Sequence, residues 1–148
     1  MTTDTARPAL LDVNVLLALT LDQHVHHAAA HRLFPTVAAA WATTPITESG
    51  LVRLLLTPQV VGRRVMSSEA VSVLNGLRDQ PGWEWWSDDA SFADTNLDLR
   101  QLMGRRQVTD MHLLDLTVRR NGILVSFDAA IPATVSPAHR DHVVVWAS

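Results

Sequence analysis

The sequence predicts an α/β fold in which a mainly parallel central sheet is flanked by helices on both faces, a three-layer α/β/α arrangement. Short apolar segments alternate along the chain with longer segments that have helical periodicity and capping residues. The short segments are continuous apolar runs, as expected for strands that are buried on both faces. No repeat, linker or low-complexity segment divides the 148 residues, so a single domain is expected.

Five segments have the composition of strands, being rich in leucine, valine, isoleucine, threonine and tryptophan. We expect strands at residues 10–15, 41–45, 83–86, 123–128 and 142–147. The first eight residues form a polar segment that ends at Pro8, so the domain itself is expected to span residues 9–148.

Helices are expected between these strands, at residues 14–21, 26–40, 47–56, 67–77 and 110–120. The predicted N-caps are Thr47, Ser67 or Ser68, and Thr109. Pro35 should kink or divide the second helix, because proline lacks the backbone N–H that a helix interior requires. Asn121, followed by glycine, is a C-terminal stop for the last helix.

The residue types that are missing exclude several kinds of chemistry. The chain has no cysteine, so disulfides, thiolate metal ligands and cysteine nucleophiles are excluded. All 12 basic side chains are arginine and there is no tyrosine, so mechanisms that need a catalytic lysine or tyrosine are also excluded. The net charge of −3 does not by itself indicate a nucleic-acid binder. No signal pattern or membrane-spanning apolar run is present, so the cytoplasm is expected by default.

Four carboxylates occupy positions that a parallel α/β fold brings to one edge of its sheet. Asp12 lies near the carboxyl end of the first strand, and Asp128 ends the fourth. Glu48 and Asp110 each lie in the first turn of a helix. Because strand C-termini and helix N-termini gather at the same edge, these side chains are expected to converge, with Asn14 beside them.

Each acid also has a purely structural interpretation. Glu48 and Asp110 suit helix N-termini through the helix macrodipole, and Asp128 suits a turn. Asp12 is the hardest to explain in this way, because aspartate is depleted in strands and is rarely buried without a partner. Four converging carboxylates would repel one another unless a cation lay between them. A ligand set made only of oxygen atoms selects Mg²⁺ or Mn²⁺.

Three blocks of the sequence resemble the PIN domain, and specifically the VapC-type toxins of bacterial toxin–antitoxin pairs. The blocks are LLDVNVLLAL, TTPITESGLVRLL and VTDMHLLDLTVRRNGILVSFDAAI, in the order and separation that the family has. The last block is the most specific, since it combines an acid at a helix start, an apolar helix, a glycine, a strand and Phe-Asp. The resemblance extends from Leu10 to Trp146. Within the family, the sequence is most similar to the mycobacterial branch.

The resemblance implies a Mg²⁺- or Mn²⁺-dependent endoribonuclease toxin that hydrolyses RNA with water activated by the ion. Its catalytic and metal-binding residues would be Asp12, Glu48, Asp110 and Asp128. Asn14 would orient Asp12, and Ser126 takes a position where family members often have threonine. Asp115 departs from the small or apolar residue that is usual there. It lies about 140° from Asp110 around an ideal helix, so we expect a supporting or surface residue and not a ligand.

RNA has to approach an acidic site, so arginines near its rim are candidates for phosphate contacts. The candidates are Arg53, Arg105 and Arg106, and also the pairs Arg63-Arg64 and Arg119-Arg120; the alternative for each is a solvated helix surface. The implied protein partners are a cognate VapB-type antitoxin and a second copy of the chain. The apolar stripes of the helices at 26–40 and 47–56 exceed what a small sheet needs to cover and would serve such contacts.

Two further patterns favour structural interpretations. His27 and His31 are four residues apart on a helix, but neither a glutamate between them nor a third ligand supports a zinc site, so a polar helix start is favoured. Trp83 and Trp85 alternate along one strand face and are expected to fill the core instead of stacking on bases. His112 is expected to be exposed.

Three alternatives compete with a ribonuclease toxin. A receiver domain or a haloacid-dehalogenase-type phosphatase also places acids at strand ends, but both use a lysine, which this chain lacks. A PIN domain without catalytic activity, acting as a binding module, is disfavoured because a scaffold has no reason to keep a repulsive acidic cluster. A PIN nuclease for RNA maturation or for DNA is not distinguished from a toxin by the sequence.

Overall fold

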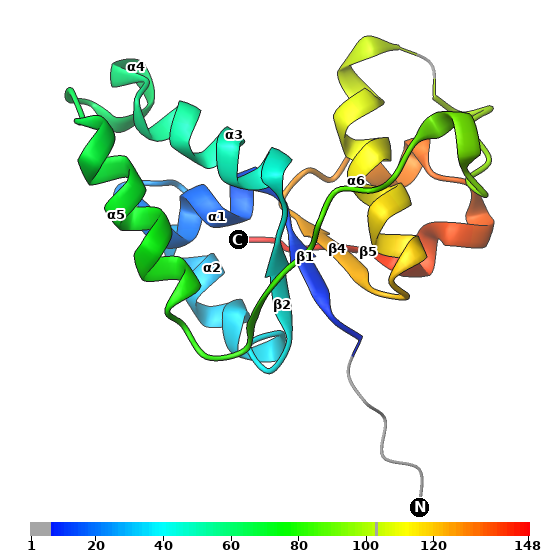
Figure 1. Cartoon of the computed structure of the whole chain (residues 1–148), viewed down its shortest axis with the longest axis horizontal. Helices are drawn as coiled ribbons and strands as arrows, with labels where there is room; N and C mark the ends of the chain where they lie inside the picture. Colours follow the sequence, from blue (N-terminus) through cyan, green and yellow to red (C-terminus); the bar gives the residue numbers. More distant parts are fainter. Residues whose placement is uncertain (1–6, 103) are drawn as a thin grey trace, which may run out of the picture.

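A computed structural model describes residues 7–102 and 104–148 as one α/β unit built on a five-stranded sheet (Figure 1). The strands are β1 (Ala9–Leu11), β2 (Trp41–Thr43), β3 (Trp83–Trp85), β4 (Ile123–Ser126) and β5 (Val143–Val145). Their order is β3-β2-β1-β4-β5, and every neighbouring pair is parallel. The predicted parallel sheet is therefore confirmed. Most of the predicted polar N-terminal segment, residues 1–6, lies outside the described residues.

The helices lie between the strands as predicted. They are α1 (Val13–Thr20), α2 (His27–Leu33), α3 (Pro45–Leu55), α4 (Pro58–Val61), α5 (Ser67–Arg78) and α6 (Val108–Arg119). Short segments of 3₁₀-helix are η1 (Phe34–Thr36), η2 (Phe92–Asp94), η3 (Arg105–Gln107), η4 (Ile131–Thr134) and η5 (Pro137–His142). Helices α1, α2, α3 and α5 lie on one side of the sheet and α6 on the other, which gives the expected three layers (Figure 1).

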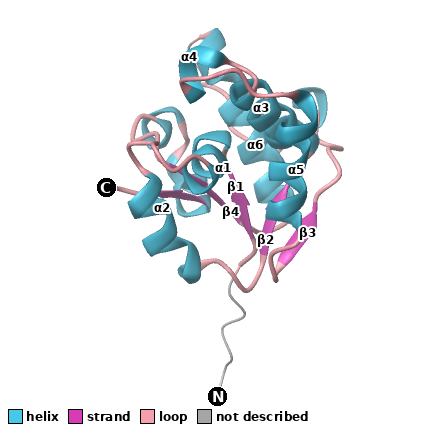
Figure 2. Cartoon of the chain, turned by 90° about the vertical axis from the view of Figure 1, so that its left-hand side faces the viewer, coloured by secondary structure: helices cyan, strands magenta, loops and turns pink. Residues whose placement is uncertain are grey.

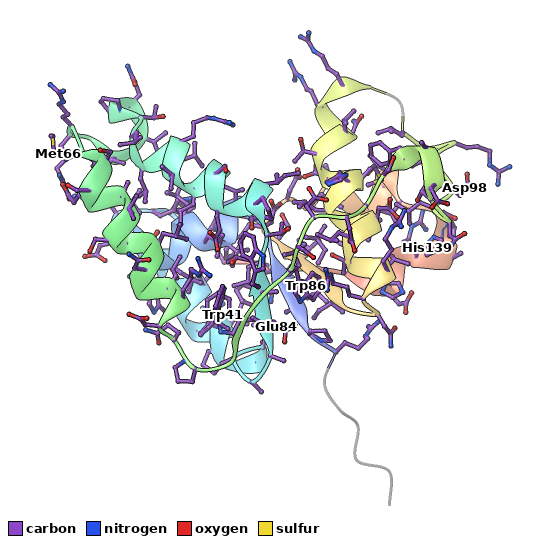
Figure 3. All side chains as sticks on the ribbon, in the orientation of Figure 1. Trp41, Met66, Glu84, Trp86, Asp98 and His139 are labelled. Atoms are coloured by element: carbon purple, nitrogen blue, oxygen red, sulfur yellow. The ribbon has the colours of Figure 1, made fainter. Side chains whose placement is uncertain are left out.

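Alternate strand residues contribute to two separate cores. Leu11 and Trp41 pack with α1, α3 and α5, whereas Leu10 and Leu124 pack with α6. The two-residue period of a strand explains this division, since successive side chains point to opposite faces. Figure 3 shows Trp41 on the α5 side and Trp86 on the α6 side.

Several boundaries differ from the sequence prediction. The first strand ends at Leu11 and not at residue 15, because α1 begins at Val13. The N-caps of α3, α5 and α6 are Thr44, Met66 and Gln107, and not the predicted hydroxyl residues. Thr47 is instead inside α3, where its Oγ1 accepts a hydrogen bond from the backbone N–H of Thr44 at 3.1 Å. Each predicted hydroxyl residue therefore lies inside the first turn, which starts up to three residues earlier than expected.

Two predicted helix terminations are confirmed. Pro35 ends the regular part of the second helix, which continues only as the 3₁₀ turn η1. Asn121 follows the C-cap of α6 in the left-handed conformation, with φ of 52°. Asparagine tolerates this conformation better than most residues, so it can reverse the chain into β4.

The WEWW segment does not fill the core as predicted. Trp85 is 44% exposed and Trp83 is only partly buried, whereas Trp86, just after β3, is buried. Because β3 is the terminal strand, its side chains have strand neighbours on one side only, which leaves more of their surface exposed.

None of the helices in the described residues is long and apolar enough to cross a membrane.

Because the sheet has packed cores on both faces, shortening a side chain is expected to destabilise the protein more in a core than at the surface. Leu124→Ala removes a fully buried side chain from the α6 core and is expected to lower the free energy of unfolding by about 2–5 kcal/mol. Leu56→Ala, at a side chain that is 39% exposed, is the matched control and should cost less than about 1 kcal/mol. Urea unfolding monitored by circular dichroism measures both. Equal losses would show that Leu124 is not in a packed core.

Candidate acidic site at the carboxyl edge of the sheet

Asp12 connects the first strand to the first helix. It follows β1 directly and is the N-cap of α1, with its Oδ1 accepting a hydrogen bond from the backbone N–H of Val13 at 2.7 Å. Its own backbone N–H donates to the carbonyl of Val125 in β4 at 2.9 Å. This position explains why an aspartate occurs within an apolar segment of the sequence: the residue is a buried helix cap that follows the strand.

Ser126, the last residue of β4, organises the polar side chains around Asp12. Its Oγ donates to Asp12 Oδ2 at 2.8 Å and accepts from Asn14 Nδ2 at 3.0 Å and from the backbone N–H of Asp128 at 3.1 Å. The Oδ1 of Asn14 in turn accepts from the backbone N–H of Phe127 at 3.1 Å. The predicted supporting residues Asn14 and Ser126 therefore both lie at Asp12, and they tie the start of α1 to the end of β4.

Asp110 and Asp128 reach the same place from two other segments. Asp110 lies in the first turn of α6, and Asp128 lies two residues beyond β4. The Oδ1 of Asp128 accepts from the backbone N–H of Ala130 at 2.9 Å, which fixes the carboxylate in a tight turn. Three of the four predicted acids are thus supplied by the ends of β1 and β4 and by the start of α6.

Burial and neighbouring charges raise the pKa of two of these carboxyl groups. Burial raises the pKa of Asp12, an effect that the hydrogen bond from Ser126 opposes and the charge of Asp128 reinforces. Burial, followed by the charges of Asp12 and Asp128, raises the pKa of Asp110 to about 6. Neighbouring negative charges that receive no compensation produce such shifts. The site therefore favours a proton or a cation.

Glu48, the fourth predicted acid, has different partners. Its Oε2 accepts from the Oγ1 of Thr43 at 2.5 Å and lies 3.9 Å from the Nε of Arg78. It is not among the charges that raise the pKa of Asp12 or Asp110. The structure therefore brings Asp12, Asp110 and Asp128 together, and it places Glu48 on the side of α3 that faces α5.

The positions of the carboxylate and imidazole groups determine whether the protein can hold a metal ion as it stands. Within the part of the chain that the structure describes, no three histidine, aspartate or glutamate side chains lie close enough together to hold one ion as they stand. The three acids nonetheless offer oxygen donors of the type that Mg²⁺ and Mn²⁺ take. The histidines considered for zinc are engaged elsewhere, since His27 Nδ1 contacts the Ala18 carbonyl and His31 Nε2 the Leu19 carbonyl.

The arginines that were candidates for RNA contacts divide into two groups. Arg53, Arg64, Arg105 and Arg106 are exposed, and the last two form the turn η3 directly before α6. The others have internal partners. Arg63 pairs with Glu69, Arg119 pairs with the buried Asp115, and the guanidinium of Arg120 lies 5.2 Å from the Trp86 ring centroid.

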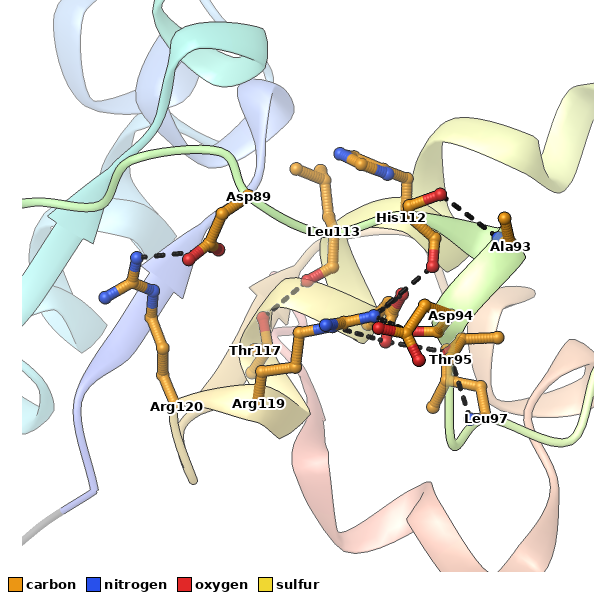
Figure 4. Close-up of polar contacts among 12 residues, drawn as sticks. Asp89, Ala93, Asp94, Thr95, Leu97, His112, Leu113, Thr117, Arg119 and Arg120 are labelled. Atoms are coloured by element: carbon orange, nitrogen blue, oxygen red, sulfur yellow. Dashed lines mark hydrogen bonds and ion pairs between the residues drawn. The ribbon is translucent and has the colours of Figure 1, made fainter.

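Asp115 and His112 are structural residues of α6. Asp115 is buried, and not at the surface; its Oδ1 accepts from Thr95 Oγ1 at 2.8 Å and lies 3.2 Å from Arg119 Nε. Figure 4 shows Arg119 reaching the segment that contains Thr95. His112 is mostly buried, and not exposed as predicted; its Nε2 lies 2.9 Å from both carboxylate oxygens of Asp88. Both pairs hold the segment between β3 and α6 against α6.

Gly50 is a residue that sequence reasoning missed. It lies on α3 where a Cβ atom would come within 2.7 Å of a methyl group of Val13, the first residue of α1. Its lack of a side chain lets α3 pack against the helix turn that carries Asp12. The glycine in the middle of a predicted helix was the available signal, because such a glycine lowers helix stability without a packing reason.

The fold and the site define a class of protein: a parallel α/β domain with carboxylates gathered at the carboxyl edge of its sheet. Known proteins similar to this chain narrow that class. The chain is 44% identical over 124 residues to Ribonuclease VapC38 of Mycobacterium tuberculosis, an alignment that covers 83% of this chain and 86% of the relative. It is 42% identical over 130 residues to Ribonuclease VapC39, covering 86% and 94%, and 36% identical over 131 residues to Ribonuclease VapC44, covering 87% and 92%, both of the same species.

No protein-family model matches the chain. The sequence identity to these relatives, over most of both sequences, is nevertheless sufficient to assign the chain to a family. The chain belongs to the VapC ribonuclease family, as the resemblance of its motifs predicted.

The raised pKa of Asp110 predicts a pH-dependent stability. Because its pKa of about 6 lies above the model-compound value of 3.8, the folded state holds this proton more tightly than the unfolded state. Its contribution to the free energy of unfolding therefore falls as the pH rises from about 4 to about 6. Asp110→Asn, measured in EDTA, should raise the unfolding temperature by about 2–4 °C at pH 8 and change it little near pH 4, since solvent screening reduces the effect at this half-exposed site to about 1 kcal/mol.

Asp98→Asn is the matched control for this measurement. The pKa of Asp98 is lowered to about 2 by hydrogen bonds from Arg100, so its neutralisation should not stabilise the protein at pH 8. A gain for Asp110→Asn that is independent of pH would show that the acids do not repel one another.

Proposed function

We propose that this protein is a Mg²⁺- or Mn²⁺-dependent endoribonuclease, the toxin component of a VapBC-type pair. One observation supports this most strongly. Asp12, Asp110 and Asp128 come from separate segments to one site, where burial and the charges of Asp12 and Asp128 raise the pKa of Asp110 to about 6. The relatives that are named ribonucleases support RNA as the substrate.

The acids suit a hard divalent ion in donor type and in charge. Asp12, Asp110 and Asp128 would hold it, with Glu48 as the fourth candidate from the sequence. When bound, such an ion stabilises negative charge that develops on a phosphate and makes water a better nucleophile. The side chains of the three aspartates have to move closer together to bind one ion. The positive charge of the ion favours this movement, because it neutralises the repulsion between the carboxylates.

The residues around the acids prepare the site for the reaction. Ser126 and the N–H of Val13 each occupy one oxygen of Asp12, so its carboxylate has a fixed orientation. Asp110 makes no such fixed contact among the described residues, and its pKa of about 6 lets it gain and lose a proton just below neutral pH. The same carboxylate is therefore the best candidate for exchanging protons with water during hydrolysis.

The surface near α6 supplies positive charge for RNA. Arg105 and Arg106 precede the helix whose first turn carries Asp110, and both are exposed. Arg53 lines a hollow of about 480 Å³ on α3 together with Glu48 and Leu56. Phosphates bound by these side chains would offset the negative charge of the acidic site.

Exposed apolar side chains on neighbouring helices support protein partners. Leu56, Val60, Met66 and Val71 lie along the end of α3, α4 and the start of α5. Exposed large apolar side chains on neighbouring helices are a feature of interaction sites. An antitoxin helix and a second copy of the chain are the partners that we propose for this part of the molecule.

The activity is tested by incubating the purified protein with end-labelled total RNA. We expect cleavage with Mg²⁺ or Mn²⁺, no cleavage with EDTA, and a loss of at least about a hundredfold in rate for Asp12→Asn, which retains the cap geometry but loses the charge. The new ends should carry 5′-phosphates, because water attacks and not the ribose hydroxyl. Cleavage that persists in EDTA, or in the Asp12→Asn protein, would contradict the proposal.

The role of Glu48 is tested separately by Mn²⁺ binding in a calorimeter. Asp128→Asn should raise the dissociation constant at least about tenfold, whereas Glu48→Gln should raise it less than about threefold, because Glu48 already accepts from Thr43 and faces Arg78. Glu69→Gln, at an exposed residue paired with Arg63, is the control. An effect of Glu48→Gln as large as that of Asp128→Asn would make Glu48 a ligand.

A further inference from the structure

A cluster of aromatic and cationic side chains lies at the edge of the sheet, outside the acidic site. Arg78 of α5 places its guanidinium carbon 4.1 Å from the ring centroid of Trp83 and 5.5 Å from that of Trp85. Both distances are within the range of cation–π contacts. Figure 2 shows β3, which carries both tryptophans, at one edge of the sheet beside α5.

Trp85 differs from the neighbouring tryptophans. Trp41, Trp83 and Trp86 each donate their indole N–H to a protein acceptor, at 3.1, 2.8 and 2.7 Å respectively. Among residues 7–102 and 104–148 none accepts a hydrogen bond from Trp85, and its side chain is 44% exposed. A large indole that is exposed to this extent, beside a cation, is not needed for the core.

A chain of polar contacts holds the cluster in place. Trp83 Nε1 donates to Thr43 Oγ1 at 2.8 Å, this hydroxyl donates to Glu48 Oε2 at 2.5 Å, and the same oxygen lies 3.9 Å from Arg78 Nε. The side chain of Arg78 is still 39% exposed. Trp83 and Arg78, which flank Trp85, are thus held in place before any ligand arrives, which lowers the entropy cost of binding one.

The register of the sheet places the cluster close to the acidic site. Trp85 pairs with Thr43, and β2 pairs with β1 so that Leu10 lies opposite Ala42. Trp85 is therefore level with the end of β1, one residue before Asp12 and two strands away, which is about 10 Å at the usual strand spacing. A single strand of nucleic acid at the acidic site can reach this distance.

We propose that Trp85 and Arg78 form a stacking site for an unpaired nucleobase of the RNA substrate. The proposal rests on the proposed function and specifies the substrate as single-stranded RNA that extends past the edge strand. Every base presents an aromatic face to an exposed indole, and an adjacent arginine attracts the phosphates. A protein strand added to β3 would use its backbone and would not require the cation, so the observations favour nucleic acid.

The test measures RNA binding without cleavage, in protein that carries Asp12→Asn. The probe is a fluorescent 12-residue oligouridylate, and the readout is its anisotropy in Ca²⁺ buffer. Trp85→Ala should raise the dissociation constant between about fivefold and a hundredfold, the range that one stacked base contributes. Trp85→Phe, which keeps an aromatic face, should stay within about threefold of the parent, as should the control Met66→Ala at a side chain that is 59% exposed.

The outcomes separate this site from the proposed function. Equal affinity of the parent and Trp85→Ala proteins would overturn the stacking site and leave the ribonuclease intact. The same would follow if Trp85→Phe lost as much affinity as Trp85→Ala, because stacking would not be the cause. If the parent bound no oligouridylate, the stacking site would fall, whereas the ribonuclease would fall only if the unmodified protein also failed to cleave total RNA. Far-UV circular dichroism of each variant verifies that it is folded.

Discussion

The structure depends on a carboxylate that is buried where the central strand becomes a helix. Asp12 follows β1, caps α1 and shares Ser126 with Asn14 and with the start of the turn at Asp128. Burial of a charge costs free energy unless hydrogen bonds or an opposite charge offset it. Here hydrogen bonds from Ser126 and Val13 oppose this cost at Asp12, whereas burial and the charges of Asp12 and Asp128 raise the pKa of Asp110 to about 6. The cation that we propose for this site would supply an opposite charge.

The topology of the sheet explains why those acids meet. Strands β1 and β4 are adjacent and parallel, so Asp12 and Asp128 follow neighbouring strand ends. Helix α6 packs on the opposite side from α1, and its first turn delivers Asp110 to the same edge. The site therefore combines the two halves of the molecule: the α1 side supplies a fixed carboxylate, and the α6 side supplies one with a raised pKa near exposed arginines. Substrate phosphate that lies between the halves would contact both.

Helix α3 contacts the surroundings of Asp12 on one side and those of Arg78 on the other. One side of this helix packs on Val13 through Gly50, close to Asp12. The other side presents Glu48 to Thr43 and Arg78, and these contacts organise the tryptophans of the edge strand. The acid of α3 thus stabilises the surface that we propose to bind a nucleobase, whereas the glycine permits the close packing that positions the carboxylate. A single helix therefore contacts both the proposed catalytic site and the proposed nucleobase-binding surface.

The sequence by itself determined the fold class, the order of strands and helices, the family, and three acids that the structure brings together. Apolar periodicity and the positions of Asp12, Asp110 and Asp128 at element ends are local properties, so they can be read along the chain. Only the tertiary structure decided which way a side chain points from a correctly predicted element. Glu48 lies in the first turn of its helix as expected, yet its partners come from β2 and α5.

Tertiary structure also determines that Trp86 is buried while Trp85 is exposed, and that Asp115 is buried. Trp86 follows β3 and packs in the α6 core, whereas Trp85 lies on the terminal strand, and a partner of Asp115 comes from a segment 20 residues earlier in the chain. Strand order and long-range packing fix these choices. They depend on contacts between residues that are distant in the sequence, which local patterns do not contain.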